Sequence, residues 1–168
     1  MVYKNRWMTV REDKVMRADG SAGIYGVVEK PDFAVIVALG DACIYLVEQY
    51  RYPVQGRYWE LPQGSWEGQH LDPLALATAE LRQETGLVAA TMTQVGRLFP
   101  SYGFCTQAYD LFLATDLRQE EQQLDPEEQG LICQKFGLRA VENMILDGTI
   151  RDAPTVAAFG LLRLKGLV

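Results

Sequence analysis

The sequence predicts an α+β sandwich that contains a mixed β-sheet. Strand patterns come first, one helix pattern follows near the middle of the chain, and two helix patterns close it after further strands. This order differs from the regular strand–helix alternation of a doubly wound fold. The chain has 168 residues, 48% hydrophobic and 23% charged, so it is long enough for one domain with a sizeable core. We therefore expect a single domain over residues 1–168.

The first strands are expected at the N-terminus. Residues 7–17 (WMTVREDKVMR) alternate loosely and are expected to form a strand pair. Asp19-Gly20-Ser21 is a turn signal, and residues 23–30 (GIYGVVEK) predict a further strand that stops before Pro31.

A hairpin is expected next. Residues 33–39 (FAVIVAL) are continuously apolar and predict a buried strand. Gly40-Asp41 turns the chain into residues 43–52 (CIYLVEQYRY), which alternate until Pro53. A short strand within residues 57–64 (RYWELPQG) then leads into a loop.

The central helix has clear signals at both ends. Asp72 is the expected N-cap and Pro73 the first helical residue, while Gly86 is the natural C-cap. Between them, an apolar stripe is expected from Leu74, Ala77 and Leu81.

Two glutamates lie beside this stripe. Glu80 and Glu84 are four residues apart, so their side chains project only about 40° apart around the helix axis. We expect them at the boundary between the core and a cleft.

The second half of the chain predicts strands and then helices. The expected elements are strands within 93–100 and 108–117 joined by a loop over 101–107, an acidic loop over 117–130, a strand over 131–136, and helices over 139–148 and 153–164.

Charge and composition narrow the function classes. The net charge of −6 provides no basic field for a nucleic-acid polymer. The N-terminus is too polar for a signal peptide, and no apolar run reaches the roughly 18 residues that span a bilayer. We expect a cytoplasmic protein with no membrane partner. The three cysteines predict buried free thiols, and the single histidine, His70, excludes a zinc hydrolase built on several histidines.

The glutamate pair has two interpretations. It is either an ordinary helix face or a metal site. Gly64 and Gly68 leave room for a ligand near the helix, and a second acidic cluster lies over residues 120–128. Hard oxygen ligands of this kind suit Mg²⁺ or Mn²⁺ bound together with a substrate phosphate.

The segment from Gly64 to Leu87 resembles the Nudix hydrolase signature. Gly64 matches its opening glycine, and the second half of the signature is matched at the end of the helix by Glu80, Leu81, Glu84, Gly86 and Leu87. The box is degenerate. One extra residue follows Gly64, the first glutamate position falls on His70 or Leu71, Ala79 replaces the arginine, and Gln83 replaces a glutamate.

The flanking segments resemble the ADP-ribose and nucleoside diphosphate sugar pyrophosphatase branch of this family, over roughly residues 5–165. The resemblance implies a Nudix-type α/β/α sandwich with an N-terminal antiparallel strand extension. It also implies a homodimer in which about the first 32 residues take part. The implied activity is Mg²⁺-dependent hydrolysis of the pyrophosphate bond of ADP-ribose or a similar compound, which yields a nucleoside monophosphate and a sugar phosphate. The alternative is a weak or inactive module that binds a nucleotide or nucleotide-sugar.

The resemblance also implies roles for particular residues. Metal ligands fall on Glu80, Glu84 and the backbone carbonyl of Gln63, with Gly64 and Gly86 as structural glycines. The general base, or a further metal ligand, falls on Glu128, with Glu127 second. A solvated acidic loop is the other interpretation of these two residues. Ala79 and Gln83 remove an arginine and a negative charge, so we expect weaker metal binding.

Several residues are candidates for substrate contacts. Arg51 is expected either to pair with a phosphate or to form a salt bridge on an edge strand. Trp7, Tyr25 and Trp59 are expected either to stack on a base or to pack in the core, with Trp7 and Tyr25 favoured for stacking. The loop facing the terminal sugar is expected to include Ser101, Tyr102 and Gly103.

Overall fold

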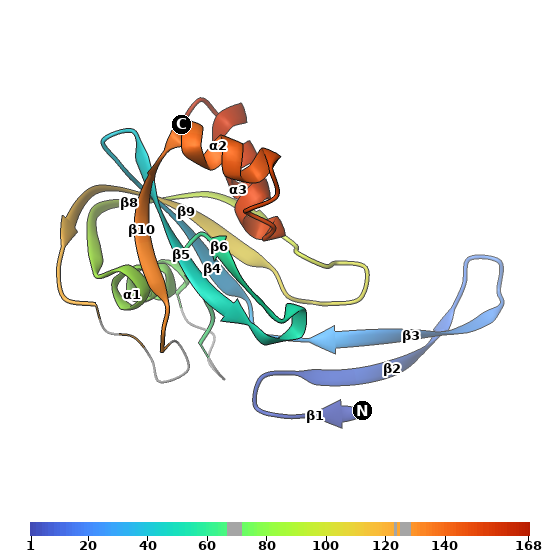
Figure 1. Ribbon diagram of the computed structural model, residues 1–168. Coiled ribbons are helices and arrows are strands. Elements are labelled where there is room, and N and C mark those ends of the chain that lie inside the picture. Colours follow the sequence, from blue (N-terminus) through green and yellow to red (C-terminus); the bar gives the residue numbers. More distant parts are fainter. Residues whose placement is uncertain (67–71, 123, 125–128) are drawn as a thin grey trace.

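The computed structural model describes residues 1–66, 72–122, 124 and 129–168. A three-stranded sheet precedes a larger mixed sheet, and one helix covers one face of the mixed sheet while two cover the other (Figure 1). The N-terminal sheet consists of β1 (Tyr3–Lys4), β2 (Thr9–Met16) and β3 (Ala22–Glu29). The rest comprises β4 (Phe33–Gly40), β5 (Cys43–Arg51), η1 (Tyr52–Val54), β6 (Gly56–Glu60), β7 (Gln63–Gly64), α1 (Pro73–Thr85), β8 (Leu87–Leu98), β9 (Tyr109–Gln119), β10 (Ile132–Gly137), α2 (Leu138–Leu146) and α3 (Ala153–Leu164).

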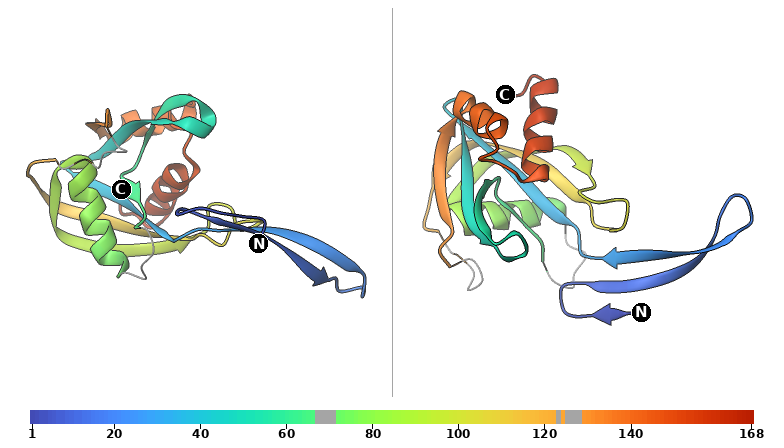
Figure 2. Two further views of the ribbon diagram at one scale, coloured as in Figure 1. Left: turned by 90° about the horizontal axis from the view of Figure 1, so that it is seen from below. Right: turned by 45° about the vertical axis from the view of Figure 1, so that its right-hand side comes forward.

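The N-terminal strands form a hairpin that projects away from the mixed sheet (Figures 1 and 2). The predicted strand pair within residues 7–17 is wrong, because most of that segment is the single strand β2, whose partner is β3. The turn lies later, at the predicted Asp19-Gly20-Ser21. There Gly20 has a φ of 81° and the Asp19 carboxylate accepts from the Ser21 amide at 2.9 Å.

The mixed sheet has the order β10-β5-β4-β9-β8, with β6 paired to β5 and β7 paired to β4. Strands β4 and β9 are parallel, and the other pairs are antiparallel. The predicted hairpin of β4 and β5 is present, but its strands pair only beside the turn, at Leu39–Ile44 and Gly40–Cys43. Beyond that point the two strands take different partners.

The sheet separates two hydrophobic cores. Along β4, Ala34, Ile36 and Ala38 pack on the side of α1, whereas Val35 and Val37 pack on the side of α2 and α3. All five are at most 1% exposed, which explains the continuous apolar run in the sequence. The fold is therefore the α/β/α sandwich with a mixed sheet that the sequence predicts.

Helix α1 begins and ends where the sequence predicts. The Asp72 carboxylate accepts from the Leu74 amide at 3.2 Å, and Gly86 ends the helix with a φ of 70°. Its apolar stripe differs from the prediction at one position. Leu74 lies in the first turn and is exposed, and Leu76 joins Ala77 and Leu81 in the core instead.

Gly86 also explains why β8 begins at Leu87, six residues earlier than predicted. The left-handed conformation of Gly86 turns the chain directly from α1 into the strand. None of the helices in the described residues is long and apolar enough to cross a membrane.

Replacing Gly86 with alanine should lower the free energy of unfolding by about 1–3 kcal/mol. Its φ of 70° disfavours a side chain, and a Cβ there would lie 2.7 Å from the Glu120 carbonyl oxygen. Urea denaturation measures the loss. As a control, Gly160→Ala in α3 should stabilise the protein by up to about 1 kcal/mol, because a Cβ there meets no atom within 4 Å. A wild-type midpoint for Gly86→Ala would contradict this account.

Candidate functional site

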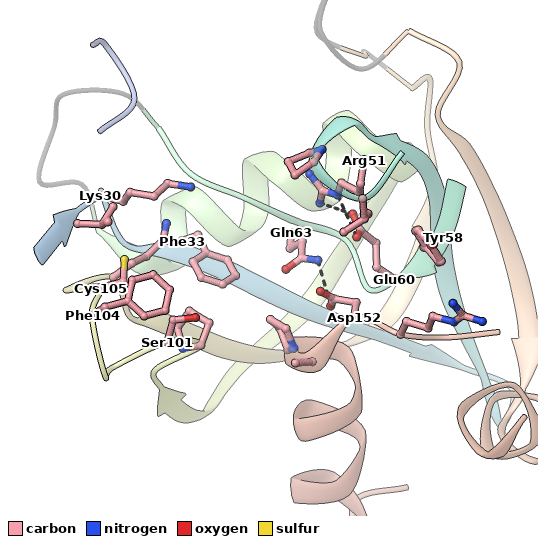
Figure 3. A pocket seen from close by; sticks show the side chains of 18 residues that line it. Lys30, Phe33, Arg51, Tyr58, Glu60, Gln63, Ser101, Phe104, Cys105 and Asp152 are labelled. Carbon is pink, nitrogen blue, oxygen red and sulfur yellow. Dashed lines mark hydrogen bonds and ion pairs between the residues drawn. The ribbon is translucent and has the colours of Figure 1, made fainter. Parts of the chain in front are cut away.

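A cavity of about 790 Å³ lies where β4 and β5 separate. In Figure 3, Lys30, Phe33, Ser101, Phe104 and Cys105 gather at one end of it. At the other end lie Arg51, Tyr58 and Glu60, with Gln63 and Asp152 between the two groups. The remaining lining residues are Val28, Pro53, Val54, Pro100, Gln107, Arg151, Ala153 and Pro154.

The cavity combines positive charge with aromatic surface. Lys30, Arg51 and Arg151 line it, and Phe33 and Phe104 supply flat apolar faces. Cations attract phosphate oxygens and aromatic rings stack on bases, so this wall suits a ligand with both groups.

Arg51 forms an ion pair at one end of the cavity. Its guanidinium bonds both carboxylate oxygens of Glu60 across β5 and β6, with Nε at 3.2 Å from Oε2. Gln49 donates to the same carboxylate at 2.7 Å. The salt bridge foreseen as one alternative for Arg51 is thus present. Arg51 also lines the cavity, with 41% of its side chain exposed, so the ion pair leaves it accessible.

Glu60 is almost completely buried, at 2% exposed. Burial raises the pKa of its carboxyl group; the neighbouring Arg51 opposes this rise, and the charge of Asp152 adds to it. The charge of Asp152, another acid of the cavity wall, therefore acts on Glu60. The sequence analysis did not single out either residue, although a glutamate inside the apolar WEL segment was a signal for Glu60.

The two glutamates of α1 lie beneath the cavity wall. Glu80 is 5% exposed and Glu84 1%, so both are more buried than the predicted boundary position implies. The main-chain amide of Gln63 donates to Glu84 Oε2 at 2.9 Å, and Gln63 itself lines the cavity. One residue of β7 thus separates Glu84 from the cavity.

Gly64 makes this arrangement possible. A Cβ at this position would lie 2.2 Å from Glu80 Oε2 and 2.4 Å from its Cδ. Glycine lets β7 pack directly against the carboxylate, and any larger residue would force the Glu80 side chain to shift. The requirement for glycine here is steric.

The carboxylate oxygens of Glu80 and Glu84 suit a hard divalent cation. Carboxylate oxygens are the protein ligands of Mg²⁺, which usually binds through one or two of them and retains several waters. Within residues 1–66, 72–122, 124 and 129–168, no three Asp, Glu, His or Cys side chains form a group that would hold a metal. Glu127 and Glu128, predicted to act as base or as a further ligand, lie outside the described residues.

Two of the other predicted contacts, Tyr25 and Gly103, are joined by a hydrogen bond. The hydroxyl of Tyr25 donates to the Gly103 carbonyl at 2.6 Å and so joins β3 to the loop before β9. Ser101 lines the cavity, and Tyr102 is 82% exposed. Trp7 is exposed as well, with the guanidinium of Arg6 4.2 Å from its ring centroid.

The aromatic candidates thus divide. Trp59 packs edge-on against Phe136, with ring centroids 4.9 Å apart, and belongs to the core on the side of α2 and α3. Trp7 and Tyr25 lie outside both cores, and neither is among the residues that line the cavity.

The charge of Glu84 acts on Cys133 in β10. Burial, together with the negative charge of Glu84, raises the pKa of its thiol to about 11. All three cysteines are free thiols, as predicted, although each is only partly buried.

Two family profiles match the chain. Residues 1–28 match the profile of the nucleoside diphosphate sugar hydrolase N-terminal domain, and residues 29–159 match that of the NUDIX domain. An ADP-ribose pyrophosphatase of Bacillus subtilis (strain 168) is 26% identical over 167 residues, which cover 98% of this chain and 89% of the relative.

Two further comparisons extend the likeness. An ADP-ribose pyrophosphatase of Mycobacterium tuberculosis (strain ATCC 25618 / H37Rv) is 31% identical over 150 residues, which cover 88% of this chain and 72% of the relative. A crystal structure of an ADP compounds hydrolase superposes with a TM-score of 0.84 at 21% identity, covering 99% of this chain and 92% of the other. That likeness supports the fold.

The Cys133 thiol should resist alkylation in the native protein. With a pKa of about 11, only about a thousandth of it is thiolate at pH 8, and the thiolate is the reactive form. Iodoacetamide labelling read by peptide mass spectrometry should show rapid modification only after unfolding, or as the pH approaches 11. Labelling of Cys133 at pH 8 as fast in the native as in the unfolded chain would contradict the raised pKa.

Proposed function

The chain belongs to the Nudix hydrolase family, and on that premise we propose that it hydrolyses the pyrophosphate bond of ADP-ribose or another nucleoside diphosphate sugar. The products are a nucleoside monophosphate and a sugar phosphate. Nudix enzymes generally use divalent metal ions, and we propose Mg²⁺ here, with Mn²⁺ able to replace it. The observation that carries the proposal is the packing of Glu80 and Glu84 against β7, directly behind a cavity with cationic and aromatic walls.

Glu80, Glu84 and the carbonyl of Gln63 are the proposed metal ligands. The metal, when bound, neutralises phosphate charge and lowers the pKa of a bound water. The protein's own part is to hold the carboxylates in place. The Gln63 amide fixes one oxygen of Glu84, and Gly64 lets the chain approach Glu80. Burial strengthens the attraction of both carboxylates for a cation.

Glu128 is the proposed base that takes the proton from the attacking water, with Glu127 as the second choice. Hydrolysis needs a group that removes this proton while the water is aligned with the phosphorus. Both residues stay predictions, because they lie outside the described residues.

The residues that line the cavity suit a substrate in which a pyrophosphate joins a nucleoside to a sugar. We propose that Arg51 and Lys30 pair with phosphate oxygens and that Ser101 faces the terminal sugar, because all three line the cavity. Tyr102 and Gly103 belong to the same loop. Stacking of the base on Trp7 or Tyr25 also stays a proposal, supported by the exposure of both rings outside the hydrophobic cores.

The degenerate box supports an alternative, a module that binds a nucleotide or nucleotide-sugar without hydrolysing it. Ala79 and Gln83 remove charges that would favour metal binding. Against this alternative, Glu80, Glu84 and Gly64 keep the packing on which metal binding depends. We therefore expect reduced metal affinity rather than loss of activity.

We further propose that the protein is a cytoplasmic homodimer and that residues 1–168 are one domain, with about the first 32 residues in the dimer contact. The projecting hairpin supports this, because β3 presents Ile24 and Tyr25 to solvent, 64% and 49% exposed. Large exposed apolar side chains on a thin sheet favour a partner surface.

Glu80→Gln and Glu84→Gln should each lower kcat/KM for ADP-ribose by at least about 100-fold, because each loses a charged metal ligand. The assay separates AMP from ADP-ribose by chromatography at several Mg²⁺ and Mn²⁺ concentrations. As a matched control, Glu142→Gln in α2, whose carboxylate pairs with Arg139 and Arg163, should keep the wild-type rate.

Glu128→Gln should lower kcat while Mn²⁺ binding changes less.

Wild-type rates in both α1 variants would refute the metal assignment. Absence of turnover on a panel of nucleotide-sugars, together with metal-independent thermal stabilisation by the same compounds, would favour the binding module.

Size-exclusion chromatography with light scattering should give twice the monomer mass of 18.9 kDa. A chain that lacks residues 1–28 should shift toward the monomer, because the hairpin would no longer contribute apolar contact area. A monomeric full-length protein would contradict the homodimer.

A further inference from the structure

We propose that Thr155 and Asp152, at the start of α3, are positioning residues for the metal site. They act through the short segment Leu61–Gln63, which carries one proposed ligand and holds another. This inference rests on the proposed function, because it takes Gln63 and Glu84 as metal ligands.

Helix α3 contacts the segment through two side chains. The Thr155 hydroxyl accepts from the Leu61 amide at 2.9 Å and donates to Asp152 Oδ2 at 2.7 Å. The same Oδ2 accepts from Gln63 Nε2 at 3.2 Å, the dashed contact in the middle of Figure 3. Two of three consecutive residues are therefore tied to α3, one by its backbone and one by its side chain.

The segment is also held by the neighbouring strand β4 and by α1. The Ile36 amide donates to the Pro62 carbonyl at 2.9 Å, and Gly64 pairs with Ala34. The Gln63 amide then donates to Glu84 Oε2 at 2.9 Å. Gln63 is thus fixed at its side chain by α3 and at its backbone by α1.

The arrangement at α3 goes beyond an ordinary helix cap. A cap requires only that Asp152 accept the Thr155 amide, which it does at 2.9 Å. Asp72 caps α1 in the same simple way, by accepting the Leu74 amide. At α3, a hydroxyl that is 1% exposed is used in addition, and it bonds a residue 94 positions away in the sequence.

These contacts should determine the positions of the proposed metal ligands Gln63 and Glu84. Ligands tolerate little displacement, and loss of a group that orients them typically lowers metal affinity 10–100-fold. If the Leu61 amide loses its acceptor, the segment is free to shift toward another one. That shift would move the Gln63 carbonyl and the amide that holds Glu84.

Thr155→Val tests the proposal, because valine keeps the shape of the side chain and removes the hydroxyl. We expect Mn²⁺ affinity of the substrate-free protein, measured from the electron paramagnetic resonance of free Mn²⁺, to fall about tenfold. The Mn²⁺ concentration for half-maximal turnover should rise in parallel. Thr155→Ser, which restores the hydroxyl, should recover wild-type affinity. Asp152→Asn should weaken binding to an intermediate degree and is the second variant if Thr155→Val does not fold.

Leu162→Ala is the matched control for general destabilisation of α3. Leu162 is completely buried in the same helix and shares a hydrophobic core with Leu61, but its side chain has no group that could accept the Leu61 amide. It should lower the melting temperature and leave Mn²⁺ affinity unchanged. Thr155→Val with wild-type Mn²⁺ affinity, or an equal loss of affinity in Leu162→Ala, would overturn the proposal.

The outcomes separate this inference from the proposed function. Wild-type protein that binds Mn²⁺ without hydrolysing any nucleotide-sugar, with weaker binding in Thr155→Val, would support positioning and refute hydrolysis. Hydrolysis by the wild type with unaltered metal affinity in the variant would refute positioning alone. Absence of Mn²⁺ binding by the wild type would refute both.

Discussion

The site depends on the packing of β7 between α1 and the cavity. This strand has only two residues, yet Gln63 donates its amide to Glu84 and Gly64 leaves the space that the Glu80 carboxylate occupies. Buried carboxylates are costly unless their environment compensates their charge, so their position is determined by the strand that packs against them. The same strand forms part of the cavity wall. Strand β7 thereby fixes how far the two carboxylates lie from the cavity.

The divergence of β4 and β5 creates the space that this strand borders. A continuous hairpin would have paired the two strands along their length and filled the gap with backbone hydrogen bonds. Instead, β4 turns to β9 and β7, while β5 turns to β6 and β10. The start of α3 then closes the gap with Asp152 and Thr155. The cavity is thus a consequence of strand pairing, and its charged groups lie at strand ends or at the start of α3.

The sequence predicts local structure well because the signals are local. Asp72, Pro73 and Gly86 define α1 through capping chemistry, and the β-branched run of β4 indicates burial on both faces. What it misses depends on distant partners. Leu74 is exposed because the first turn of α1 lies beyond the edge of the core, and the position of that edge cannot be predicted from the pattern within α1. The roles of Glu60 and Asp152 require two segments to meet that lie about 90 residues apart in the sequence. The Asp152–Thr155 spacing predicts the helix cap but not its contact with Leu61.

The effect of the substitutions in the degenerate box depends on how deeply each substituted position is buried. The substituted positions Ala79 and Gln83 are half-buried on α1, whereas Glu80 and Glu84 on the same helix are almost completely inaccessible. A charge lost from a half-buried position weakens the field felt by a cation but leaves the backbone and the buried carboxylates in place. A charge lost from a buried position would have changed the packing against Gly64 and Gln63. The substitutions therefore leave intact the framework that holds Glu80 and Glu84. That framework is an arrangement of three elements, because α1 supplies the carboxylates, β7 spaces them from the cavity, and α3 holds β7.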